Sequence, residues 1–162
     1  YRMGMLFLSV GQVEEAVKAF AAEVEKHPGD VPAARELGLG LAQLNEPARA
    51  IAQLELLTRR LPGEGANWRA LGYAYMRAAR PSDAEKALRR AITLPPQNAL
   101  EHRDLGFVLA ATGRESEARA EYRRAIAGLR TGQDVLFKVM RRSAADQLDT
   151  VYLAGSVPAP EQ

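Results

Sequence analysis

Apolar residues along this 162-residue chain recur at the spacing of α-helices. Residues 31–64 show the pattern in two series, one before residue 45 and one after it. The first series is Leu37, Leu41 and Leu44, and the second is Ala50, Leu54 and Leu57. Because side chains three or four residues apart share one face of an α-helix, each series predicts an amphipathic helix. The segment therefore predicts a pair of helices joined by a short turn.

Turn and cap residues mark where these helices begin and end. Asn45-Glu46-Pro47 has the composition of a helix start, with Asn45 as the cap and Pro47 in the first turn. Pro62-Gly63 ends the second helix. Further along, Asn98 and Glu101 have the spacing of a capping box, which predicts another helix start.

The whole pattern repeats every 34 residues, which predicts four repeats over residues 1–30, 31–64, 65–98 and 99–132. Several residue types keep this step: Gly4, Gly38, Gly72 and Gly106; Ala16, Ala50, Ala84 and Ala118; Pro28, Pro62 and Pro96; and the bulky residues Phe20, Leu54, Leu88 and Tyr122. Glycine inside a helix costs about 1 kcal/mol relative to alanine. We therefore expect Gly38 to have a packing role, in which the absence of a side chain lets the partner helix approach.

The third repeat carries the fullest set of a known motif: Trp68, Leu71, Gly72, Tyr75, Ala84, Leu88, Ala91 and Pro96. In this set the chain resembles the tetratricopeptide repeat (TPR) family over residues 1 to about 131. The fourth repeat departs from the motif, with His102 at the place of Trp68 and Arg130 where a Pro would fall. The resemblance implies an all-α, right-handed α-solenoid of antiparallel helix pairs, with a concave inner surface lined by the first helix of each repeat.

Residues 133–154 form an amphipathic stretch outside the period. Their apolar stripe is Phe137, Met140, Ala144, Leu148 and Val151. Because a helical array leaves its last repeat half uncovered, this stretch predicts a capping helix that completes a single domain, 1–154. The alternative is a helix that docks on another protein. Residues 155–162 contain two prolines without periodicity and predict a flexible tail or linker.

The resemblance also predicts the binding surface. The side of each first helix opposite the core is partly apolar, although an ordinary surface helix would be polar there. We call this side the predicted concave face, and its candidate partner-binding residues are Arg35, Leu39, Gln43, Arg69, Tyr73, Met76, Arg77, Arg103 and Phe107. Large apolar groups there are candidate anchors, and arginines suit carboxylates of a partner.

Each feature of this face has a second interpretation. Part of the apolar surface is expected to pack between neighbouring first helices. The arginines could instead stack locally, Arg69 on Tyr73 and Arg103 on Phe107, or be neutralised by Asp104. Some TPR domains hold a C-terminal carboxylate with Lys and Asn. This chain has Met5, Leu39, Tyr73 and Phe107 at the place of that Asn, so this specificity is not expected.

Paired arginines near the ends of the second helices predict a solvated convex face. The pairs are Arg59-Arg60, Arg89-Arg90 and Arg123-Arg124. Glu55 precedes Arg59 by four residues and Glu85 precedes Arg89 likewise, the spacing of surface ion pairs. A surface for RNA or phosphate is the alternative interpretation.

Composition and charge narrow the classes of function. With 47% hydrophobic and 26% charged residues the chain is globular, and a net charge of +2 gives no strong field for nucleic acid. There is no cysteine, and no catalytic pair, metal-ligand cluster or phosphate loop appears around the two histidines. We therefore expect neither an enzyme nor a metal or cofactor site.

The source and compartment are constrained only weakly. The 18 arginines against 4 lysines suggest a GC-rich bacterial genome. The apolar start, Met3 to Leu8, is too short for a membrane span and has no basic lead of a signal peptide. The chain does not begin with Met, and we expect a segment of a longer protein, either cytoplasmic or associated with the cell envelope.

The leading hypothesis is a non-catalytic scaffold that binds a protein segment, with acidic residues to match the arginines, in the concave groove. A second is an assembly or spacer segment of a longer solenoid in a bacterial envelope or secretion complex, in which self-association is possible. A third is binding of a polyanion, either RNA or an acidic polysaccharide. Nucleic acid is the least expected of these partners.

Overall fold

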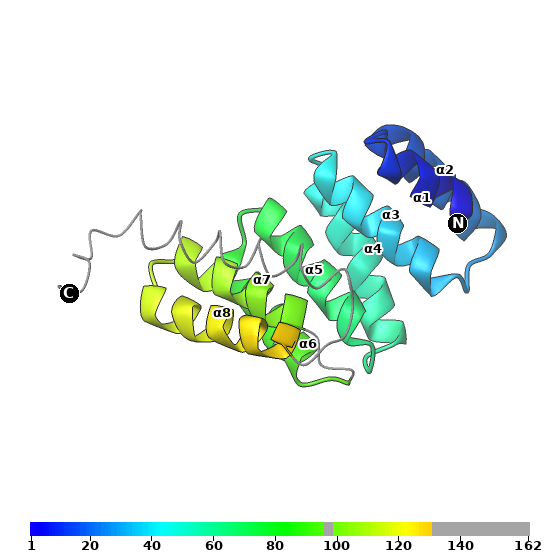
Figure 1. Ribbon diagram of the computed structural model, residues 1–162. Helices are drawn as coiled ribbons and strands as arrows, with labels where there is room; N and C mark the ends of the chain where they lie inside the picture. The colour runs from blue at the N-terminus through cyan, green and yellow to red at the C-terminus, as the bar shows by residue number, and fades with distance from the viewer. Residues whose placement is uncertain (96–98, 131–162) are drawn as a thin grey trace. The chain divides into compact units, whose positions relative to one another are not determined.

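The computed structural model describes residues 1–95 and 99–130, and these residues form eight α-helices and no strand (Figure 1). The helices are α1 (Arg2–Ser9), α2 (Val13–Lys26), α3 (Val31–Gln43), α4 (Pro47–Arg60), α5 (Gly65–Arg77), α6 (Pro81–Ile92), α7 (Ala99–Ala111) and α8 (Glu115–Arg130). The all-α fold class is confirmed. The expected capping helix 133–154, the tail 155–162 and the Asn98 cap lie outside the described residues.

The turn between the two helices of every repeat uses the same backbone conformation at the same position. Gly11, Asn45, Ala79 and Gly113 all have positive φ, between 55° and 77°, and they follow each other at steps of 34 residues. The expectation that Asn45 caps α4 is therefore wrong, because this residue adopts the left-handed conformation and Glu46 is the capping residue. Asparagine suits either role, since its short polar side chain also tolerates left-handed backbone.

Other helix starts follow the sequence more directly. The Asp30 side chain accepts a hydrogen bond from the backbone N–H of Ala33 at 2.9 Å, which satisfies a donor at the start of α3. α4 and α6 both begin at a proline, Pro47 and Pro81, whose missing N–H costs nothing in the first turn of a helix.

The described residues fall into two compact units. The N-terminal unit, Tyr1–Gln97, contains α1 to α6. In it the two helices of each repeat pack on each other, α2 and α4 pack on the first helix that follows them, and α3 packs on α5. The C-terminal unit begins at Asn98 and contains the pair α7 and α8.

Glycines of the 34-residue series lie where the two helices of a repeat cross most closely. A Cβ added at Gly38 would lie 2.5 Å from Cγ of Leu54, and one at Gly72 would lie 2.7 Å from Cγ of Leu88. Both distances are far below van der Waals contact, so only glycine permits these crossings. The packing role expected for Gly38 is confirmed, and its partner is the bulky residue that keeps the same step.

Tyr122 and a histidine–glutamate pair organise the core of the C-terminal unit. A Cβ at Gly106 would lie 2.6 Å from Cε1 of Tyr122, and burial raises the pKa of the Tyr122 phenol. Nδ1 of His102 lies 2.7 Å from Oε2 of the buried Glu121. The His102 side chain thus gives Glu121 a polar partner in the place where the third repeat has Trp68.

Candidate interaction surface

Residues of the predicted concave face lie on two neighbouring helices of the N-terminal unit. Arg35, Leu39 and Gln43 lie along α3, and Arg69, Tyr73, Met76 and Arg77 lie along α5, on which α3 packs. Tyr73 is 38% exposed, whereas Leu39 is half-buried and packs against the core. Leu39 therefore contributes to packing between repeats, as the second interpretation expected, while Tyr73 leaves a large ring open to solvent.

Two arginines of this face are held by hydrogen bonds that link α3 and α5. Nη1 of Arg35 donates to Oδ1 of Asn67 at 3.3 Å, and Nε of Arg77 donates to the carbonyl oxygen of Ala42 at 3.2 Å. Asn67 is fully buried, and its side-chain nitrogen has no hydrogen-bond partner in the part of the chain that the structure describes. Sequence reasoning missed Asn67, because its role depends on a residue 32 positions earlier.

The remaining predicted residues, Arg103 and Phe107, belong to the C-terminal unit and are described with it alone. Arg103 donates to Oδ1 of Asp104 from Nε at 2.9 Å and from Nη2 at 2.6 Å. Of the two local interpretations, neutralisation by Asp104 is the one found for Arg103. Phe107 is 51% exposed, so it repeats in this unit the open aromatic side chain that Tyr73 presents in the other.

A polar cluster on the other side of α5 contains a cation–π contact that sequence analysis did not anticipate. The guanidinium of Arg80 lies 4.7 Å from the centre of the Tyr75 ring, and the Tyr75 hydroxyl donates to Oε1 of Glu55 at 2.7 Å. Burial and this hydrogen bond raise the pKa of Tyr75 to about 12. The cluster connects α4 and α5 and fills the space between them.

The arginine pairs of the second helices form surface ion pairs as expected. Arg59 lies 3.5 Å from Glu55, and Nε of Arg89 donates to Glu85 at 2.9 Å. Their exposure makes each pair worth at most about 1 kcal/mol. In the residues that the structure describes, no three acidic or histidine side chains gather as a metal site would require, and no helix could span a membrane.

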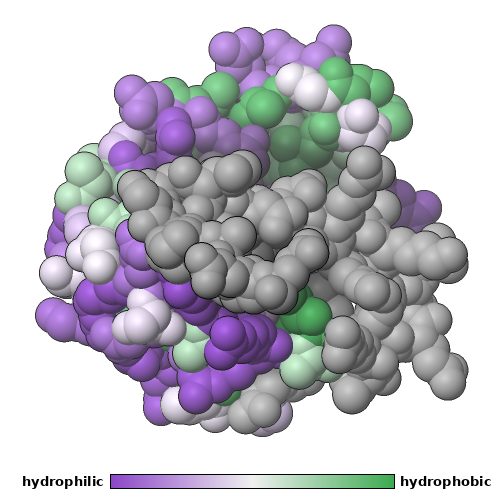
Figure 2. All heavy atoms as spheres, turned by 60° about the vertical axis from the view of Figure 1, so that its left-hand side comes forward, coloured by the Kyte–Doolittle hydropathy of each residue, from purple (hydrophilic) through white to green (hydrophobic). Residues whose placement is uncertain are grey.

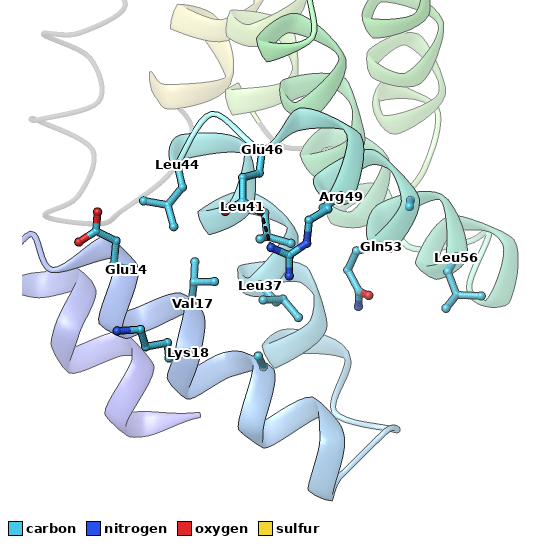
Figure 3. Close-up of a pocket in the computed structure, with 12 residues that line it drawn as sticks. Glu14, Val17, Lys18, Leu37, Leu41, Leu44, Glu46, Arg49, Gln53 and Leu56 are labelled. Atoms are coloured by element: carbon cyan, nitrogen blue, oxygen red, sulfur yellow. Dashed lines mark hydrogen bonds and ion pairs between the residues drawn. The ribbon is translucent and has the colours of Figure 1, made fainter.

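A hollow that the sequence analysis missed lies between second helices. It is a groove of about 740 Å³ bounded by α2 and α4, with α3 as its floor, and we call it the α2–α4 groove (Figure 3). Its lining residues are Glu14, Val17, Lys18, Ala21, Leu37, Leu41, Leu44, Glu46, Arg49, Ala52, Gln53 and Leu56. Figure 3 shows Val17 of α2 pointing toward Leu37 and Leu41 of α3. None of the predicted site residues lines this groove.

Figure 2 adds the surface view of one face of the molecule. Hydrophobic side chains gather in its upper part, at the height of the first helices in Figure 1, and hydrophilic side chains cover much of the remaining coloured surface. The large apolar side chains exposed in the N-terminal unit are Tyr1, Met3, Met5, Leu6, Val10, Leu56 and Tyr73.

Comparison with known proteins agrees with the sequence motif and the fold. The family model described as Tetratricopeptide repeat matches residues 1–64 and 69–133. No curated protein matches the chain. Among solved structures, MamA from Desulfovibrio magneticus RS-1, residues 41 to the end, is 22% identical with a TM-score of 0.69, over 83% of this chain and 76% of that one.

Two further MamA structures cover more of both chains. One is 23% identical with a TM-score of 0.64 and covers 92% of each chain. The other is 22% identical with a TM-score of 0.63, over 97% of this chain and 95% of that one. At this level of identity the likeness shows a shared helical-repeat fold.

Proposed function

The chain belongs to the tetratricopeptide repeat family, and on this premise we propose that it binds a segment of a partner protein on the predicted concave face. The family and the helical-repeat fold make the chain a protein-interaction scaffold of a typically non-catalytic kind. Solenoids of this kind present extended surfaces on which a partner segment can lie.

The observation that carries the proposal is one position of the repeat at which large apolar side chains stay exposed. Met5, Tyr73 and Phe107 share this position and are 40%, 38% and 51% exposed. By contrast, Leu37, Leu71 and Leu105 share the position two residues earlier and are buried. Apolar groups that the fold leaves open in register are what a partner segment would use as anchors.

The arginines give this surface a preference for carboxylates. Hydrogen bonds to Asn67 and Ala42 hold Arg35 and Arg77 across the surface formed by α3 and α5, so less side-chain entropy is lost when a partner binds. Both bonds use only part of a guanidinium, which has five N–H donors. The remaining donors suit an acidic side chain of the bound segment.

The affinity expected for a linear peptide is modest. Full burial of one large apolar side chain contributes about 1.5–3 kcal/mol. Association itself costs on the order of 4–15 kcal/mol, so a few anchors support dissociation constants of about micromolar strength. A longer segment that contacts more repeats would bind more tightly.

The experiment compares three variants in a pull-down from the source organism, each first shown to be folded by circular dichroism. Changing Tyr73 and Phe107 to Ser removes the anchors and should abolish capture of the natural partner. Changing Arg35, Arg69 and Arg103 to Gln should weaken capture and reduce its dependence on salt. The matched control changes the exposed arginines of the second helices, Arg89, Arg90, Arg123 and Arg124, to Gln and should leave capture intact.

The result that would overturn the proposal is the reverse pattern, with the partner lost in the control variant and kept in the other two. Salt dependence tests polyanion binding in the same assay. The affinity of a polyanion falls steeply with salt concentration, whereas a segment held by apolar anchors loses little.

A further inference from the structure

The α2–α4 groove is an open apolar surface on helices that the predicted concave face does not use. Its floor is aliphatic, formed by Leu37, Leu41 and Leu44 of α3. Along its wall on α4, Ala52 is exposed and Leu56 is 46% exposed. A leucine kept this open in a packed helical array leaves apolar area that a bound side chain could bury.

The next pair of second helices shows how the same space can be closed. Residues 34 positions further on occupy the equivalent places between α4 and α6, and there Tyr75 replaces Leu41 and Glu55 replaces Ala21. The Tyr75 hydroxyl donates to Glu55 at 2.7 Å, and Arg80 lies over the ring. The exposed positions of Ala52 and Leu56 are taken by Lys86 and Arg90. One repeat therefore carries a filled and charged version of a surface that its neighbour keeps open and apolar.

Charges at the rim of the groove pair mostly with each other. Lys18 lies 2.8 Å from Glu15, and Arg49 forms an ion pair with Glu46. Glu14 also lines the groove and lies next to these pairs, and no ion pair to it is found among the described residues. The rim thus offers one carboxylate to an incoming cation, while the middle offers only apolar contacts and the amide of Gln53.

Spacing along α4 sets the kind of segment that would fit. Arg49, Ala52, Gln53 and Leu56 line the groove at intervals of i, i+3, i+4 and i+7, which is two turns of helix or about 10 Å. A partner helix of two to three turns presents side chains at the same intervals and can lay them between α2 and α4.

We propose that the α2–α4 groove binds an amphipathic helix of a partner protein, with three aliphatic side chains on one face and a basic residue near one end. The aliphatic side chains pack on Leu37, Leu41 and Leu56, and the basic residue pairs with Glu14. The proposal concerns a surface separate from the concave face, so it can hold or fail without the function proposed above.

The test uses a synthetic peptide of about 18 residues with leucines at i, i+3 and i+7, one lysine beside them, and alanine and glutamine elsewhere. Fluorescence anisotropy of the labelled peptide measures binding to the full chain. The groove variant changes Ala52→Lys and Leu56→Arg, which imports the residues of the next repeat at positions that are exposed and therefore tolerant. We expect it to lower affinity about tenfold or more, because it places two charges against the apolar face of the peptide.

The control variant, Ala22→Lys with Ala48→Arg, adds the same charge to α2 and α4 at exposed positions outside the groove. It should bind within about twofold of the unmodified chain, as should the variant with Ser at Tyr73 and Phe107. Absence of saturable binding, or equal loss in the groove and control variants, would overturn the proposal. Self-association of the chain that only the groove variant removes would assign the groove to a second copy and overturn it as stated.

Discussion

Replacement of Gly38 by alanine tests whether the close crossing of α3 and α4 sets the packing of a repeat. The three atoms nearest to an added Cβ all belong to Leu54, at 2.5, 2.8 and 2.9 Å. Leu54 is fully buried, so its side chain cannot swing aside and α4 must move instead. Overpacking of this kind costs about 1–3 kcal/mol, while alanine gains about 1 kcal/mol in helix propensity. We expect Gly38→Ala to lower the free energy of unfolding by about 1–2 kcal/mol.

The double variant with Leu54→Ala isolates the cause. Leu54→Ala alone should cost about 2–5 kcal/mol, because it removes a buried side chain and leaves a cavity. It also removes the three atoms that obstruct position 38, so Gly38→Ala should become stabilising by about 1 kcal/mol in that background. The two substitutions are then coupled by about 2–3 kcal/mol.

Urea unfolding followed by far-UV circular dichroism measures the four free energies of this cycle. Gly29→Ala serves as a control, since a Cβ there meets no atom within 4 Å. If Gly38→Ala destabilised the protein equally with and without Leu54, the steric argument would be refuted and the glycine would have another role.

Two further predictions concern the turn and the polar cluster beside it. Ala79→Gly should raise the free energy of unfolding by up to about 1 kcal/mol, because a left-handed alanine is strained by about 1–2 kcal/mol and the flexibility of glycine in the unfolded chain offsets part of the gain; a lower urea midpoint would contradict this. Tyr75 has a folded pKa of about 12, above the usual 10, so the stability from its bond to Glu55 is present below pH 10 and lost as pH rises through 12. Absorbance titration should therefore show a late phenolate that Tyr75→Phe removes, and loss of the same signal at ordinary pH would exclude the assignment.

The period of 34 residues explains how much of the fold the sequence could predict. Each repeat supplies the same helix pair, so the eight described helices and the Gly38–Leu54 crossing both follow from residues that share a register. The cap at Asn45 was predicted wrongly because that residue was judged alone. Read in register with Gly11 and Gly113, position 45 belongs to a series that favours positive φ, and this series marks the turn.

The candidate surface was harder to predict for two physical reasons. Arginine partners such as Asn67 for Arg35 depend on which side chains meet between repeats, and no spacing within one helix reveals them. The α2–α4 groove arises from small side chains on two separate helices, so it leaves no periodic signal in either one. Comparison of equivalent positions does reveal it, because Leu41 and Ala21 in one repeat stand where Tyr75 and Glu55 stand in the next. In a repeat protein the departures between repeats, rather than the shared motif, therefore indicate where individual surfaces have separate roles.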